Sequence, residues 1–392
     1  MPRFFLPIAG KSGQNGPGAH DRRRRDGRNP DSAARRRSGA GGDAGDGGAG
    51  GSGWALAALL YLSVFTFLAD SALRPEAAPE GAAERFDDIL PVLLALAHFA
   101  LLPLAVWLLA RGDGGAWERV LIFAAFALFF GIMSTANAHE LIHRPERWRR
   151  ALGRWVFVSL LFGHHVSAHL AVHHRHVATP FDPNTARPNE GFWRFFARAW
   201  RGSLRAGLAV EKARLARRGL PPWHISNPYL GYGAGALAFL GLAAVLAGPA
   251  GVAAWVALAA SAQLFLLLSD YVQHYGLQRR ALPGGGFEPV GLRHSWNAPH
   301  VFSGALMMNA PRHSDHHARP DLPHGQLRLR RREGAPMLPR SLPVMSCIAL
   351  LPGLWRRVMN PHLQAWRHAE EAARADSPPR PGQDPAMIRP GP

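Results

Sequence analysis

The sequence predicts an all-α integral membrane protein, organised as a bundle of transmembrane helices. Five apolar segments each approach the ~20 residues that an α-helix needs to cross a bilayer; they are 54–73, 89–110, 116–136, 229–247 and 250–272. Strongly polar connections separate them, so the mean hydropathy is only −0.08 although the apolar runs are long. Such alternation is typical of a multi-pass membrane protein with polar loops.

The two ends of the chain differ in composition from this apolar region. Residues 1–53 are rich in Gly, Arg, Ser and Asp, lack hydrophobic periodicity and contain no apolar core of a secretory signal. We therefore expect a disordered Arg/Gly-rich N-terminus over 1–53, one membrane domain over 54–367, and a disordered C-terminal tail over 368–392.

The distribution of arginine predicts the orientation in the membrane. The formal net charge is +18, and the connection 137–228 and the region after Arg279 are both rich in arginine. By the positive-inside rule these regions face the cytoplasm, and the acidic loop 74–88 faces the other side. No nucleic-acid-binding motif accompanies the positive charge, so we expect no nucleic-acid partner.

The number of membrane segments conflicts with the charge of the N-terminus. Three spans before residue 137 would place the Arg-rich residues 1–53 outside, which the same rule disfavours. An even number of spans removes the conflict. We therefore expect either one more membrane segment ahead of Trp54, which would make six where five are visible, or one of the three segments not crossing.

Histidine is the residue that carries the chemistry. Of 20 histidines, fifteen lie between His139 and His317, and nine of these form four clusters. His139 and His143 are spaced i, i+4 at the end of the third apolar segment, so they lie on one helix face and can share a metal. His169 and His173 repeat this spacing, and His174 lies about 100° further round the helix, where it can reach a second metal.

The other two clusters follow the last apolar segment. His274 stands alone, with Asp270 four residues before it as a candidate acceptor for its second ring N–H. His313, His316 and His317 are spaced so that one helical turn presents all three, with Asp315 between them in the same candidate role.

Nine imidazoles are too many for one ion, which takes three or four protein ligands, and suit two ions. Imidazole binds iron, zinc, copper and nickel alike, so the ligand type does not select the metal. The run 155–163 is too short to cross the bilayer, so all four clusters return to the same side. The sequence thus predicts a two-metal site at the cytoplasmic mouth of the bundle.

One alternative is a membrane zinc protease. Residues 139–143 match the HExxH pattern, in which Glu140 would act as general base. That function needs three ligands and leaves six histidines without a role. We read the isolated histidines as ordinary surface or core residues, and those beside the clusters as candidates for supporting contacts: His164, His165, His176, His294 and His300.

The clusters resemble those of the membrane alkane 1-monooxygenases, which belong to the fatty acid desaturase/hydroxylase superfamily. The resemblance runs from about residue 54 to 367 and is carried by 137–143, by His169, His173 and His174 followed by 177–183, and by 271–277, 294–297 and 312–318. Ala168, Val172 and Asp270 depart from the family pattern, which has Glu, Gly and Asn there.

The resemblance implies six membrane helices in a bacterial inner membrane, with the active site facing the cytoplasm. It implies a diiron centre held by His139, His143, His169, His173, His174, His274, His313, His316 and His317. The implied reaction is hydroxylation of the terminal carbon of an alkane with O₂. The electrons would come from NAD(P)H through a separate rubredoxin and its reductase, because Cys347 alone cannot form a fused rubredoxin site. Related substrates are alkyl-aromatic methyl groups and fatty acyl chains.

Overall fold

The computed structural model describes residues 53–73 and 84–375, and every regular element in them is a helix. Extended pairing within these ranges is limited to two isolated bridges, Ala281 with Phe287 and Asn297 with Met337. The expected all-α membrane architecture is confirmed. Residues 1–52, for which the sequence predicts disorder, lie outside the described residues, and so does most of the acidic loop 74–88.

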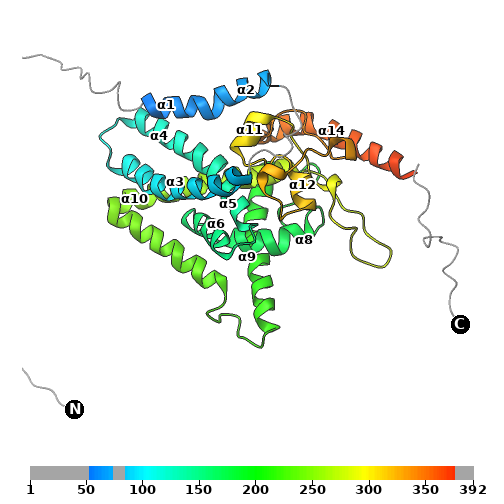
Figure 1. Cartoon of the computed structure of the whole chain (residues 1–392), viewed down its shortest axis with the longest axis horizontal. Helices are drawn as coiled ribbons and strands as arrows, with labels where there is room; N and C mark the ends of the chain where they lie inside the picture. The colour runs from blue at the N-terminus through cyan, green and yellow to red at the C-terminus, as the bar shows by residue number, and fades with distance from the viewer. Residues whose placement is uncertain (1–52, 74–83, 376–392) are drawn as a thin grey trace, which may run out of the picture. The chain divides into compact units, whose positions relative to one another are not determined.

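Four helical stretches are long and apolar enough to cross a membrane. The first, Gly53–Ala72, joins α1 (Gly53–Leu60) to α2 (Thr66–Ala72) through a π-helical turn, η1 (Tyr61–Phe65). The second lies in α3 (Glu84–Arg111). The third, Ala116–Ile142, joins α4 (Ala116–Leu128) to α5 (Thr135–Ile142) through another π-helical turn, η2 (Phe129–Ser134). The α1–α2 stretch lies along α4 and α11 (Val301–Leu306) (Figure 1).

The fourth stretch, α10 (Pro228–His274), contains a sharp reversal. Ala247 and Gly248 leave helical geometry, and Gly248 has φ +61° and ψ −152°, a conformation open only to glycine. The rings of Phe239 and Trp255 stack 5.7 Å apart, although 16 residues of straight helix would separate them by about 24 Å. The 47 residues therefore fold back as two helices, which correspond to the predicted spans 229–247 and 250–272.

Shorter helices follow the third span. The helix α6 (Arg147–Ser159) packs so closely on α5 that a Cβ on Gly153 would lie 2.7 Å from Leu141 Cβ. Next come α7 (His164–Ala168), the π-helical turn η3 (His169–His173) and α8 (His174–His176), which together form one helical stretch. The longer α9 (Phe192–Ala216) precedes α10. As expected, 155–163 is not among the candidate spans.

The C-terminal half is made of short helices and loops. They are η4 (Leu292–His294), α11, α12 (His313–Ala318), η5 (His324–Gln326), η6 (Arg331–Glu333), α13 (Leu342–Ala349) and α14 (Pro352–Ala375). The expected boundary at residue 367 falls inside α14, whose last residues are mostly Ala, Glu and Arg, which are strong helix formers. The rest of the expected tail lies outside the described residues.

A buried polar contact ties three helices together below the site. His98 Nε2 on α3 lies 2.8 Å from Ser159 Oγ at the end of α6. Trp255 on α10 donates its indole N–H to the carbonyl of the same Ser159 at 2.7 Å. Buried polar groups need such partners, so this contact fixes how α3 and α6 pack against α10, the helix that ends at His274.

Candidate metal centre

All nine predicted histidines come together, in two groups whose ring nitrogens lie within 4.8 Å of one another inside each group. The first, here called group 1, is His139, His143, His169, His174 and His316. The second, group 2, is His173, His274, His313 and His317. Segments nearly 180 residues apart in the chain thus meet at one place, at the end of α5, in η3 and at the start of α8, at the end of α10, and on α12.

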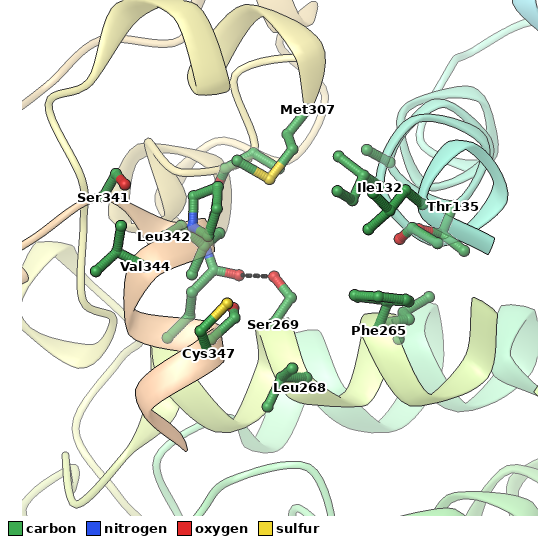
Figure 2. A pocket seen from close by; sticks show the side chains of 18 of the residues that line it. Ile132, Thr135, Phe265, Leu268, Ser269, Met307, Ser341, Leu342, Val344 and Cys347 are labelled. Carbon is green, nitrogen blue, oxygen red and sulfur yellow. Dashed lines mark hydrogen bonds between the residues drawn. The ribbon is translucent and has the colours of Figure 1, made fainter. Parts of the chain in front are cut away.

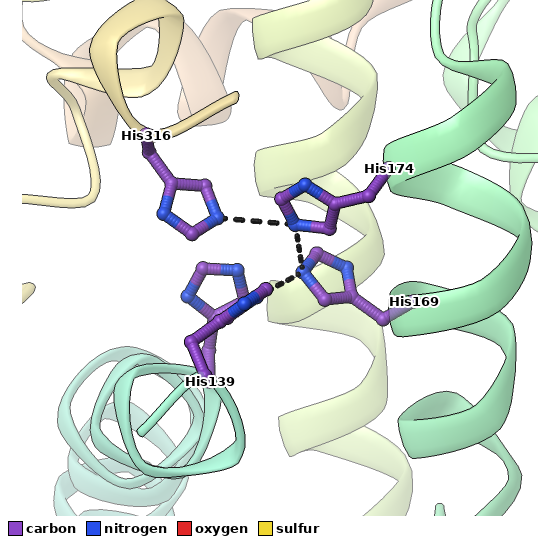
Figure 3. A group of neighbouring side chains, drawn as sticks. His139, His169, His174 and His316 are labelled. Atoms are coloured by element: carbon purple, nitrogen blue, oxygen red, sulfur yellow. Dashed lines mark hydrogen bonds between the residues drawn. The ribbon is translucent and has the colours of Figure 1, made fainter. Parts of the chain in front are cut away.

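In group 1 the Nε2 atoms face one another (Figure 3). His169 Nε2 lies 3.0 Å from His143 Nε2 and 2.9 Å from His174 Nε2, and His174 Nε2 lies 3.2 Å from His316 Nε2. The ring of His139 completes the group, with its centroid 4.5 Å from the His169 ring and 4.6 Å from the His316 ring.

In group 2 neighbouring ring nitrogens also lie about 3 Å apart, and all four side chains are buried. His313 Nε2 lies 3.0 Å from His274 Nε2 and 3.2 Å from His317 Nε2. His173 Nε2 is buried without a hydrogen-bond partner among the described residues. The two groups adjoin, since the rings of His174 and His317 are 4.6 Å apart.

These contacts fit a metal better than hydrogen bonds. His169 Nε2 faces two other Nε2 atoms, yet one ring nitrogen offers a single proton or a single lone pair. Two nitrogens bound at right angles to one ion, each 2.0–2.1 Å from it, would lie about 2.9 Å apart. Both groups, within the described residues, consist of histidine alone. The donor set therefore suits two transition-metal ions.

The division of the second cluster differs from the prediction. His169 belongs with His174, five residues on, whereas His173 belongs to group 2. The cause is η3, because a π-helical turn pairs residues five apart instead of four. The i, i+4 rule for a regular helix therefore pairs His169 with His173, whereas the structure groups His169 with His174. On α12, which is regular, His313 and His317 do share a group at i, i+4.

Burial keeps the rings in the neutral form that binds metals. It lowers the pKa well below 6.5, and the neighbouring imidazoles lower it further; this holds for His143, His169, His174, His313, His316 and His317. The apo site thus presents lone pairs and not a cluster of positive charges.

His173 is the exception, because a carboxylate supports it. Its Nδ1 lies 2.9 Å from Asp182 Oδ2. Burial acts to lower the pKa of His173, but the charge and hydrogen bond of Asp182 outweigh it and the pKa is raised. Asp182 is itself held by Thr185 Oγ1 at 2.7 Å and the backbone N–H of Asn184 at 3.0 Å. This carboxylate orients the ring and leaves Nε2 for a metal.

The two carboxylates predicted to support histidines do something else. Asp270 accepts a hydrogen bond from the side chain of Asn184 at 2.6 Å, whereas His274 Nδ1 lies 3.4 Å from Ser295 Oγ. Asp315 pairs with Arg319 at 2.6 Å and Arg330 at 3.2 Å. Its neighbours in sequence are ligand candidates, but its side chain points to the opposite face of α12, as its position between His313 and His316 requires.

Glu140 does not have the position of a protease base. Its Oε1 pairs with Arg144 at 3.0 Å and accepts the backbone N–H of His324 at 3.1 Å. The carboxylate is buried, and its contacts join α5 to the start of η5. The zinc-protease alternative therefore lacks its general base.

The histidines beside the clusters play several parts. His294 Nε2 lies 3.3 Å from Glu288. His164 and His165 are buried in α7, and neither His164 Nε2 nor either nitrogen of His165 has a partner among the described residues. His176 and His300 are only partly buried. None of these five belongs to either group.

An apolar cavity of about 420 Å³ lies beside the metal groups, and Figure 2 shows part of its wall. Its walls come from η1 and α2, η2 and α5, the end of α10, and α13, and include Ile132, Phe265, Met307, Leu342 and Cys347. His139 from group 1 and His313 from group 2 both line it. The volume is that of a small-molecule site, and a ligand bound in it can lie next to both metal groups.

Comparisons with known proteins agree with this geometry. Residues 115–349 match the family model described as fatty acid desaturase. The chain is 32% identical over 298 residues to alkane 1-monooxygenase 1 of Alcanivorax borkumensis, covering 73% of this chain and 70% of that protein. It is 31% identical over 290 residues to alkane 1-monooxygenase of Pseudomonas putida, with coverages of 73% and 71%. The chain belongs to the membrane alkane 1-monooxygenase family.

The family assignment sets the coarse function. Like other members of the alkane 1-monooxygenase family, a diiron family, the chain is a multi-pass membrane hydroxylase of the desaturase superfamily. It is also 30% identical over 248 residues to the hydroxylase component of xylene/toluene monooxygenase from Pseudomonas putida, covering 62% of this chain and 64% of that protein. Because the chain belongs to this family, we reject the alternative function of a membrane zinc protease.

Proposed function

We propose that the protein is a diiron monooxygenase that hydroxylates the terminal carbon of alkanes with O₂. The observation that carries the proposal is the apolar cavity lined by one histidine from each group, His139 and His313. We assign the five histidines of group 1 to one iron and the four of group 2 to the other. The irons would supply O₂ activation and C–H cleavage.

The rest of the chain binds and orients the substrate. Side chains such as Ile132, Phe265 and Leu342 offer an alkyl chain only apolar contacts and exclude water from the reacting end. Part of its wall belongs to the candidate membrane spans, and we propose that a hydrocarbon dissolved in the bilayer enters from that side.

The electron supply is part of the same proposal. We assign the metal side to the cytoplasmic face of a bacterial inner membrane, because the Arg-rich connection 137–228 belongs inside. A separate rubredoxin, reduced by its reductase and NAD(P)H, is the proposed donor. An acidic carrier of this kind would be steered to the positive face.

Iron content and product identity test the proposal together. The purified protein should hold about two iron ions, and with rubredoxin and its reductase it should convert octane or hexadecane to the 1-alcohol. His316→Ala should lose iron and activity together, whereas His368→Ala, at an exposed ring, should keep both. One zinc per chain, or a fully active His316→Ala protein, would refute the assignment.

A second substrate class is favoured by one relative. The similarity to the xylene/toluene monooxygenase component suggests hydroxylation of a methyl group on an aromatic ring. Feeding p-xylene beside octane and hexadecane separates the two classes. A predominance of 4-methylbenzyl alcohol would assign the aromatic class, and unsaturated fatty acyl products would instead indicate a desaturase.

A further inference from the structure

A second cavity, of about 440 Å³, lies where α6, α7, η3, α9 and the start of α10 meet. It shares no lining residue with the cavity beside the metal groups. Four arginines line it, and we call it the arginine cavity: Arg147, Arg150, Arg154 and Arg214. The acid among its lining residues is Glu211. Neither the metal groups nor the substrate cavity gives these arginines a role.

The three arginines of α6 share one face of that helix. Arg147, Arg150 and Arg154 are spaced i, i+3 and i+7, and residues at such positions lie one above another along a helix. Arg147 and Arg154 are exposed and Arg150 is partly buried, so a ligand can reach all three side chains. Arg214 lines the same cavity from α9. The cavity thus brings together four positively charged side chains from two helices.

Glu211 neutralises one of these four charges. Its Oε2 pairs with Arg214 Nε at 2.7 Å, and its Oε1 accepts the hydroxyl of Ser167 at 2.8 Å. Arg214 also donates to the carbonyl of Ser226 at 3.0 Å. Both carboxylate oxygens therefore have partners, and Glu211 leaves the arginines of α6 without an acid in the cavity.

Those three arginines carry charge that the described part of the chain does not balance. Arg150 donates to the carbonyls of Arg144 and Pro145, which are neutral groups. Arg147 and Arg154 make no ion pair or side-chain hydrogen bond among the described residues. Like charges at i, i+3 and i, i+4 on a helix repel one another, so an anion bound among the three would relieve this repulsion.

The cavity lies at the boundary between the membrane and water. It includes Pro228, where the candidate span of α10 begins. Exposed apolar side chains flank it, namely Trp155 on α6, and Trp223 and Ile225 before α10, of which Ile225 is 83% exposed. Tryptophan gathers at the level of the lipid headgroups. Because α10 reverses at residues 247–248, its start lies on the same side of the membrane as its end, where group 2 begins.

The arginine cavity combines its charge with an apolar wall. Ile142, Val166 and Leu170 line it beside the arginines. A guanidinium can hold two phosphate oxygens through parallel hydrogen bonds, and basic cavities at the membrane surface suit acidic lipid headgroups. We propose that this cavity binds the headgroup of an anionic phospholipid, with the phosphate among the three arginines of α6 and the glycerol end against the apolar wall.

The same charges select against other lipids. A zwitterionic headgroup carries a cation as well as a phosphate, and that cation would meet unbalanced positive charge, so such a lipid binds more weakly. Inorganic phosphate meets the arginines but gains nothing from the apolar wall. Leu170 belongs to η3, so the bound lipid also contacts the turn that carries His169 and His173. The inference does not depend on which oxidation the metal centre performs.

Lipid binding to the purified iron-loaded protein tests the inference. Native mass spectrometry from detergent counts bound lipids and gives dissociation constants for dioleoyl phosphatidylglycerol and dioleoyl phosphatidylcholine. The cavity variant is Arg147→Gln with Arg154→Gln. The matched control, Arg217→Gln with Arg218→Gln, removes the same charge at exposed arginines that follow α9 and do not line the cavity. The unfolding temperature of each protein without added lipid reports its folding.

The wild-type protein and the control should bind one phosphatidylglycerol per chain, and phosphatidylcholine about tenfold more weakly. The cavity variant should bind phosphatidylglycerol about 30-fold more weakly than wild type, with its affinity for phosphatidylcholine unchanged. Arg147→Lys with Arg154→Lys keeps the charge and loses the paired hydrogen bonds, so its affinity should lie between the two. That variant also serves if the Gln variant fails to fold.

Four results would overturn the inference. Equal losses in the cavity variant and the control would show diffuse attraction instead of a site. Equal affinities of wild type for the two lipids would remove the selectivity. Displacement of the lipid by millimolar inorganic phosphate would indicate a site for the free anion. An acidic rubredoxin that binds the cavity variant more weakly, while phosphatidylglycerol binding is unchanged, would assign the arginines to a protein partner.

Discussion

His173 Nδ1 and Asp182 Oδ2 lie 2.9 Å apart, and both side chains are buried. The pair fixes which nitrogen of His173 remains for group 2. The two residues are nine positions apart, in η3 and in the loop that follows α8. The loop that contains Asp182 thus sets the orientation of the His173 ring in group 2.

Asp182→Asn should weaken metal binding in group 2. The amide cannot hold the ring as an anion does, and loss of such a supporting group typically lowers metal affinity about 10- to 100-fold. We expect iron per chain to fall from about two towards one. Asp321→Asn, at an exposed carboxylate, is the control, and full iron in Asp182→Asn would contradict the role given to the pair.

Acidification should destabilise the metal-free protein. Burial holds the pKa of His169, His316 and His317 well below 6.5, so these rings are neutral when folded and take up protons on unfolding. The unfolded state then binds more protons, and stability that is complete above pH 6.5 is lost as the pH falls below it, by up to about 1.4 kcal/mol per unit for each ring.

Thermal unfolding of the apo and iron-loaded forms between pH 7.5 and 5.5 measures this effect. The apo midpoint should fall with pH, and the iron-loaded form should resist until iron is released, since protons and metal compete for the same nitrogens. A flat apo profile would show that the rings are not held neutral by burial.

Glu140→Gln should reduce stability without removing the metals. The carboxylate pairs with Arg144 and accepts the N–H of His324. Breaking one side of a buried pair leaves the other charge uncompensated, at a cost of about 3–5 kcal/mol, and the retained amide oxygen offsets part of it. We expect a lower unfolding temperature with iron content unchanged. Loss of activity with unchanged stability would instead restore a catalytic role for Glu140.

Gly248→Ala should destabilise the helical hairpin of α10. A Cβ at this position meets open space, so the effect comes from the backbone alone, whose φ of +61° and ψ of −152° cost a non-glycine residue about 1–3 kcal/mol. Gly241→Ala, also in open space but in helical geometry, should leave the unfolding temperature unchanged or slightly raised. Equal effects of the two substitutions would argue against the strained turn.

Ile132→Phe should shift the preference towards shorter alkanes. Ile132 lines the cavity between the membrane helices (Figure 2), and a bulkier ring takes up space that the chain would fill. The ratio of hexadecane to octane turnover should fall, and Ile132→Ala should move it the other way. Equal ratios in both variants would place the substrate elsewhere.

The sequence predicted the helical membrane architecture because apolar length is a local property. It also predicted the nine clustered histidines, because their spacing is local. It did not predict Asp182 as the partner of His173, because the two residues meet through a loop and not through helical spacing. It predicted Asp270 as the partner of His274, at the spacing that a regular helix favours, whereas Asp270 accepts a hydrogen bond from Asn184. It named His165 as a candidate for a supporting contact, but neither ring nitrogen of His165 has a partner among the described residues.

The π-helical turn at 169–173 has a consequence for how this centre tolerates change. If the same residues formed a regular α-helix, His169 would share a face with His173, four residues on, instead of with His174. The segment would keep all three histidines but would divide them differently between the two groups. The backbone, as much as the imidazoles, therefore encodes which ion each ring serves, and a chain can keep every histidine and still lose the site.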